Sequence, residues 1–126
     1  MAAHSSLPAS MLGCHGHILT CRFKPTSSST EAELITGGAV KSISRTSAGI
    51  YVLTLNDKWS HLLFSAANLV TGFAANPSAQ CDAYVAGVSL TGKTVTINTM
   101  SGVTNSDFTD AEVDVLLVVD DSTVTE

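Results

Sequence analysis

The closing stretch of the chain, residues 112–120, limits most strongly what this sequence can fold into. It reads Glu-Val-Asp-Val-Leu-Leu-Val-Val-Asp. In an extended strand, four valine and leucine residues at alternating positions share one face, while Leu116 and Val118 lie on the other. A strand that is apolar on both faces needs cover on both sides. We therefore expect a β-protein whose second face is covered by a neighbouring subunit.

The rest of the sequence is also typical of strands joined by turns. Apolar and Ser/Thr residues alternate in seven segments, and Gly, Asn and Pro residues stand between them. This pattern predicts an all-β fold, an antiparallel sandwich or small barrel of about seven strands. Helix should be limited to one turn within residues 105–112, although residues 65–69 could also be helical. The predicted strands are 15–24, 40–45, 50–55, 61–70, 79–90, 94–100 and 112–120.

Length and composition indicate one domain with a permanent partner. The chain has 126 residues, which is enough to bury a sizeable core. Charged residues make up 13% of it, against about a quarter in ordinary soluble domains. Residues 1–32 form an extended N-terminal arm, a first strand and a Ser/Thr-rich loop, and residues 33–126 form the β-sandwich or barrel body. A surface with so little charge favours a protein that is partly hidden in an assembly.

The distribution of charge argues against nucleic acid and membrane partners. Residues 94–126 carry seven of the eleven acidic residues and none of the six basic ones. Without a basic cluster the chain lacks the side chains that neutralise phosphates, so we expect no nucleic-acid partner. No apolar run approaches the ~18–20 residues of a membrane helix, so we expect no membrane partner. The start of the chain also lacks the basic and apolar regions of a signal peptide.

One cluster has the residue types of a metal site. Cys14, His15, His17 and Cys21 lie within eight residues, whereas zinc ligands are usually two close pairs with a spacer between them. With Cys81 the cysteine count is three, an odd number without a CxxC pair, which favours reduced thiols made in a cytosol. We expect no bound metal. A small Cys/His metal-binding protein is kept as an alternative function that ranks below the two given at the end of this section.

The remaining candidates for chemistry do not form a site in sequence. Residues 87–94 match the spacing of a phosphate-binding loop, but the β-branched run after them predicts a hairpin where that loop needs a helix. Cys81 and His61 have the residue types of a nucleophile and its base, without an activating motif around either. The carboxylates of residues 107–112 lack the spacing of a calcium loop. We expect no catalytic residue and no cofactor.

Interface residues can be chosen on the same physical grounds. Leu116 and Val118 form the second face of the closing strand. Trp59 lies near a turn, where a single aromatic residue is a typical contact of a partner. The apolar residues with which the arm could attach to a partner are Leu7, Met11 and Leu12. The candidate interface residues are Leu7, Met11, Leu12, Trp59, Leu116 and Val118.

Several segments resemble a pattern in small virion proteins of tailed bacteriophages. Residues 45–59 follow the run R-T-x-x-G-x-Y-x-V-x-L-x-D, with Leu53 in place of the valine. A Leu-Leu strand comes next, here beginning at Leu62. A Lys-Thr-Val-Thr-Ile strand follows at residues 93–97, and an Asp-x-x-Val-x-Val-Leu-Leu-Val strand closes the pattern at residues 110–118. The resemblance covers roughly residues 39–122.

Within that group, the role that fits best is a head decoration, or cement, protein. The resemblance implies a small β-barrel or sandwich, often trimeric, that binds the outside of the capsid and clamps adjacent major capsid subunits. Its partners would be other copies of itself, as a homotrimer, and the major capsid protein. It would be made in the host cytoplasm, would reside on the capsid surface of the virion and would not be an enzyme. The alternative is a phage tail, fibre or host-surface-binding β-module.

Overall fold

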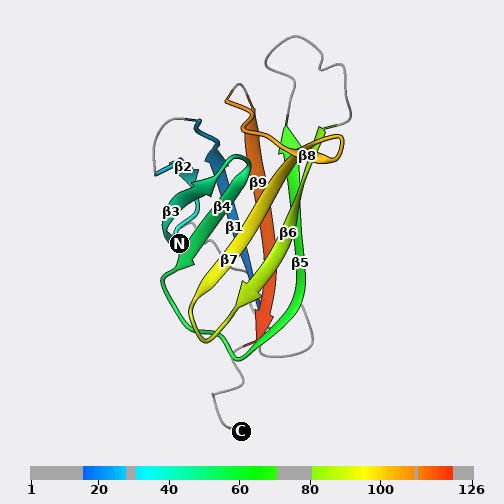
Figure 1. The fold of residues 1–126 in the computed structure, drawn as a ribbon. Coiled ribbons are helices and arrows are strands. Elements are labelled where there is room, and N and C mark those ends of the chain that lie inside the picture. The colour runs from blue at the N-terminus through cyan, green and yellow to red at the C-terminus, as the bar shows by residue number, and fades with distance from the viewer. Residues whose placement is uncertain (1–15, 28–30, 71–80, 110, 121–126) are drawn as a thin grey trace, which may run out of the picture.

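All regular elements in the described part of the chain are strands. The computed structural model describes residues 16–27, 31–70, 81–109 and 111–120 (Figure 1). No helix occurs in these ranges, so none there could cross a membrane. The strands are β1 (Gly16–Lys24), β2 (Glu33–Thr36), β3 (Val40–Ser47), β4 (Ile50–Leu55), β5 (His61–Val70), β6 (Cys81–Ser89), β7 (Thr94–Ser101), β8 (Thr104–Asn105) and β9 (Glu112–Asp120).

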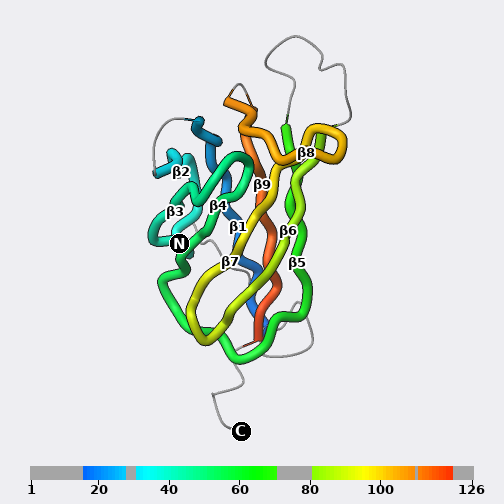
Figure 2. The backbone as a smooth tube through the Cα atoms, viewed as in Figure 1, coloured from blue at the N-terminus to red at the C-terminus, as the bar shows by residue number. Residues whose placement is uncertain are grey.

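The strands form two antiparallel sheets that pack face to face. One has the order β2-β1-β9-β5, and the other has the order β3-β4-β7-β6 with the short β8 paired to β7. An isolated bridge between Glu31 and Ser44 joins the sheets on one side, where the Ala32 N–H donates to the Ile43 carbonyl at 3.1 Å. On the other side β5 and β6 lie next to each other without a ladder (Figure 2). The all-β prediction is confirmed, and the fold is a sandwich and not a closed barrel.

All seven predicted strands are present, and the structure adds β2 and β8. β2 forms in a segment whose sequence pattern is weak, because its residues pair with β1. The expected helical turn within residues 105–112 is wrong for the part described: Asn105 belongs to β8, and the following residues form no helix. Residues 65–69 are extended within β5. Tertiary pairing therefore decided the segments in which local propensity was ambiguous.

The core fills the space between the inner faces of the two sheets. β1 and β9 supply one side of it, and β3, β4 and β7 supply most of the other. Phe23 and Tyr51 are fully buried in this core, with ring centroids 5.4 Å apart and a tilt of 54°. Tilted aromatic pairs at this separation stabilise a core beyond their buried area. β9 is a central strand of its sheet, and its inner valines and leucine belong to this core.

Two tight turns depend on residues with a positive φ. The β3–β4 hairpin has Gly49 at φ 70°, where an added Cβ would lie 2.7 Å from the Thr99 carbonyl oxygen. Only glycine fits there without strain. In the β6–β7 hairpin the residue with positive φ is Lys93, at 61°, and not the neighbouring Gly92. The Lys93 carbonyl accepts a hydrogen bond from the Leu55 N–H at 2.7 Å, which holds this turn against the end of β4.

Candidate functional site: an apolar outer sheet face

The two faces of β9 have different environments. Its inner residues (Val113, Val115, Leu117 and Val119) are buried in the core. Its outer residues (Glu112, Asp114, Leu116, Val118 and Asp120) are half-buried and point away from the other sheet. The alternation expected from the sequence is confirmed. Within the described chain, no second layer packs on the outer face of the β2-β1-β9-β5 sheet.

Register extends the apolar character of β9 onto both neighbouring strands. Val118 pairs with Ile18 of β1 on one side and with Phe64 of β5 on the other. Leu116 pairs with Ala66 of β5. Side chains that are directly opposite each other on one face lie in contact, so these rows form a continuous surface. We call this surface, together with Leu63, the apolar belt: Ile18, Leu63, Phe64, Ala66, Leu116 and Val118.

A β-bulge raises two large side chains at one end of the belt. The register between β5 and β9 shifts between Leu62 and Phe64, which leaves Leu63 as the extra residue of β5. Leu63 is 50% exposed and Phe64 is 53% exposed. Bulges redirect side chains and are usually features with a purpose. Here the bulge presents two neighbouring apolar side chains to solvent, and we call them the Leu63–Phe64 knob.

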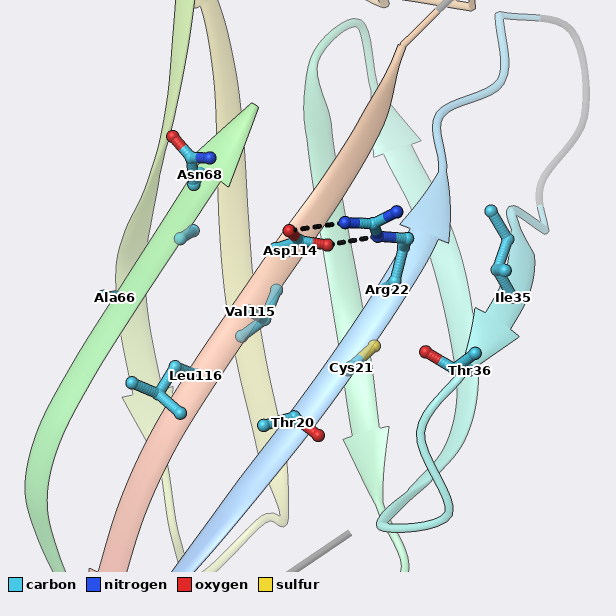
Figure 3. Close-up of a pocket in the computed structure, with 11 residues that line it drawn as sticks. Thr20, Cys21, Arg22, Ile35, Thr36, Ala66, Asn68, Asp114, Val115 and Leu116 are labelled. Carbon is cyan, nitrogen blue, oxygen red and sulfur yellow. Dashed lines mark hydrogen bonds and ion pairs between the residues drawn. The ribbon is translucent and has the colours of Figure 1, made fainter. Parts of the chain in front are cut away.

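An open groove lies farther along the same face (Figure 3). It has a volume of about 580 Å³ and crosses from β2 over β1 and β9 to β5. Its floor is made largely of short side chains, among them Thr20 and Ala66, beside Leu116. Ile35 and Thr36 of β2 line the other side. The groove forms because the short side chains of Thr20 on β1 and Ala66 on β5 are in register with the longer Leu116 of β9.

Charged residues mark one end of the groove. The Arg22 guanidinium donates to both carboxylate oxygens of Asp114, with Nη2 2.8 Å from Oδ2, and also to Glu112 at 3.2 Å. These side chains are between a quarter and two-fifths exposed, so the ion pairs contribute little stability. The guanidinium offsets only one of the two carboxylate charges, so this end of the groove stays charged beside an apolar surface, which is the arrangement of a polar rim around an interface core.

The other end of the belt carries His61 and Asp120. The two are opposite each other in the β5–β9 ladder, and His61 Nδ1 lies 3.9 Å from Asp120 Oδ2. Asp120 Oδ1 is buried and has no hydrogen-bond partner among the described residues. In the described part of the chain no group of three or more His, Cys, Asp or Glu residues could hold a metal ion. As far as the described residues go, this end of the belt is polar and holds no metal-binding cluster.

The Cys/His cluster that the sequence contains is only partly within the described residues. His17 and Cys21 lie on the inner face of β1, whereas Cys14 and His15 fall outside the described ranges. Burial, and to a lesser degree the nearby Asp114 carboxylate, raises the pKa of the Cys21 thiol to about 12. A thiol with this pKa is protonated at neutral pH and therefore a poor nucleophile.

Trp59 has a clear structural contact. It is half-buried, packs against the core, and its ring centroid lies 5.1 Å from that of His17. Nothing in the structure tests whether it also meets a partner, and that role remains a prediction. The arm residues Leu7, Met11 and Leu12 lie outside the described part of the chain.

The fold assembles neither of two other candidate sites from the sequence, the phosphate-binding loop and the Cys81–His61 pair. Gly87 lies within β6 and Thr94 begins β7, so residues 87–94 belong to a hairpin, as predicted from the β-branched run. His61 begins β5 and Cys81 begins β6, and Figure 1 shows these strands running in opposite directions. Their first residues are therefore at opposite ends of the sandwich. The nucleophile–base pair considered in the sequence is not assembled.

A cluster that the sequence did not predict surrounds Asp107. Its carboxylate accepts hydrogen bonds from Arg45 Nη2 at 2.7 Å, from the Gly49 N–H at 2.8 Å and from the Tyr51 hydroxyl. Burial by itself would raise the pKa of Asp107, but these hydrogen bonds lower it below its ordinary value. Burial and the same carboxylate raise the pKa of Tyr51. The cluster fixes the loop before β9 against the β3–β4 hairpin.

The Asp107 cluster gives a physical meaning to part of the sequence pattern. Arg45, Gly49 and Tyr51 are the arginine, glycine and tyrosine of the R-T-x-x-G-x-Y run, and all three donate to one carboxylate. The signal that could have revealed the cluster is this spacing together with an aspartate in a later polar loop. Comparison of the chain with protein-family models, with curated proteins and with solved structures found no match.

Proposed function

We propose that this chain is a structural binding module that works within a permanent assembly, using the outer face of the β2-β1-β9-β5 sheet. The observation that carries the proposal is the apolar belt. It spans three adjacent strands, includes Leu63 and Phe64 at half exposure, and has paired charges at its edge. Contiguous exposed apolar surface with a polar rim is typical of interaction sites.

The specific role that we propose is decoration of a tailed-phage capsid. The resemblance over residues 39–122 supports this role. Arg45, Gly49 and Tyr51 of that pattern also share one structural task, because all three donate hydrogen bonds to Asp107. In this role the belt joins copies of the chain, as a homotrimer, and other surfaces of the module bind the major capsid protein. A rigid sandwich with two layers suits a clamp, because it transmits force between capsid subunits without deforming.

Native mass is the first test. Light scattering over a dilution series should give a stable multiple of the 13.0 kDa chain, and a multiple of three would agree with the decoration role. A clean monomer at every concentration would contradict self-association through the belt.

Shell binding is the second test. The fluorescently labelled chain is mixed with empty shells of the tailed phage that encodes it, and the shells are sedimented. Saturable binding at a fixed number of copies per capsid subunit is expected. If the labelled chain stays in the supernatant with intact shells, the capsid role is wrong, whatever its oligomeric state.

A host-surface-binding module is the second candidate, because of one feature on the opposite sheet. Tyr84 is 44% exposed, and its hydroxyl accepts a hydrogen bond from the Asn98 amide at 3.0 Å. Thr96 lies on the same outer face, beside an open space over Gly87. An aromatic ring next to hydroxyl and amide groups suits the ring and hydroxyls of a sugar. Binding of the chain to host cells, lost in Tyr84→Ala, would favour this candidate over capsid decoration.

A further inference from the structure

The outer face of the β2-β1-β9-β5 sheet carries a projection and a hollow side by side. The projection is the Leu63–Phe64 knob, raised by the bulge in β5. The hollow is the groove beside Ala66, two residues farther along the same strand. Phe64 and Ala66 have the same parity after the bulge, so both side chains leave the same face of the sheet. The face therefore holds both halves of a complementary contact.

One molecule cannot join these two halves by itself. Side chains on a strand stand roughly perpendicular to the sheet, so Phe64 projects away from the surface and not along it into the groove. A second copy that approaches face to face reverses this direction and points its Phe64 into the hollow. The groove, at about 580 Å³, has room for more than one large side chain, and Thr20, Ala66 and Leu116 offer it mainly carbon atoms.

We propose that the groove is the receptor for the Leu63–Phe64 knob of a second copy of this chain. The inference rests on the proposed function, in that it names the partner of the same apolar face. In the homotrimer of the proposed function, each copy inserts its knob into the groove of the next copy around the ring. Arg22 with its carboxylates forms the polar edge of the contact.

The experiment uses two complementary variants and a control. Phe64→Ser removes the knob, and Ala66→Tyr fills the hollow with a residue that strands accept well. Val103→Ser is the control, because Val103 is 95% exposed in the turn between β7 and β8, away from the belt. Sedimentation equilibrium of the full chain gives the dissociation constant of the oligomer. We expect each belt variant to weaken association by about thirtyfold or more and the control to leave it unchanged.

Mixing the two variants provides the decisive reading. A Phe64→Ser copy keeps its hollow, and an Ala66→Tyr copy keeps its knob, so an equimolar mixture can form one intact contact. The mixture should associate more tightly than either variant alone, as measured by fluorescence energy transfer between differently labelled copies. Equal weakness of the mixture and the separate variants would overturn the knob-and-groove contact, as would normal association of either variant.

These outcomes are distinguishable from failure of the proposed function. Wild-type chain that forms oligomers insensitive to Phe64→Ser, yet binds shells, would refute this contact while leaving the capsid role in place. Wild-type chain that assembles through Phe64 but does not bind shells would support this contact and refute the capsid role.

Discussion

At the scale of single residues, Asp107 has the most consequential environment in the chain. Its side chain is 8% exposed and accepts hydrogen bonds from three separate groups at one end of the sandwich. We predict that Asp107→Asn lowers the free energy of unfolding by about 2 kcal/mol at pH 7, because the Tyr51 hydroxyl and the Gly49 N–H lose a charged acceptor. Urea titration followed by Trp59 fluorescence measures this. Asp57→Asn, an exposed carboxylate in the turn after β4, is the control and should cause little change.

The same residue predicts a pH dependence. The pKa of Asp107 is lower in the folded chain than its ordinary value of 3.8, so folding favours the ionised carboxylate. Its contribution to stability is therefore complete above about pH 5 and is lost as the pH falls through the folded pKa. The stability difference between wild type and Asp107→Asn should shrink between about pH 5 and about pH 2. A difference that stays constant over this range would show that ionisation of Asp107 does not stabilise the fold.

At the scale of elements, the two faces of β9 make different demands on the same strand. Val115 is buried in the core, whereas its neighbour Leu116 lies in the apolar belt. We predict that Val115→Asp abolishes cooperative folding, because it buries a charge without a partner. Leu116→Asp should leave the circular dichroism spectrum largely intact and disrupt assembly. Comparison of unfolding and native mass for the two variants checks this, and normal oligomers of Leu116→Asp would count against a buried outer face.

β9 also shows which part of the structure the sequence could specify. Its alternation fixed both faces, since a period of two residues has one meaning in a strand. The bulge in β5 could not be predicted, because residues 62–64 are all apolar and only pairing with β9 selects the register. The groove was equally hidden, because its depth depends on the sizes of side chains such as Thr20 and Ala66, which are distant in sequence. The Asp107 cluster joins residues that are 62 positions apart.

At the scale of the whole molecule, the sandwich and its assembly should be thermodynamically linked. If the outer face of β9 is covered only in the oligomer, association stabilises the folded chain by mass action. We therefore predict that the thermal midpoint rises by about 2–4 °C for each tenfold increase in protein concentration. Differential scanning calorimetry between low and high micromolar concentrations measures this. The control, Val103→Ser, should keep the dependence because it lies outside the belt.

Phe64→Ser should remove the concentration dependence while leaving the midpoint of the dilute protein almost unchanged. Phe64 is half exposed within one chain, so its loss costs the isolated sandwich little buried area, whereas the oligomer loses its central contact. A midpoint that falls equally at all concentrations would mean that Phe64 stabilises its own chain and not the assembly. The belt would then be an outer surface of the fold, and the second face of β9 would need no partner.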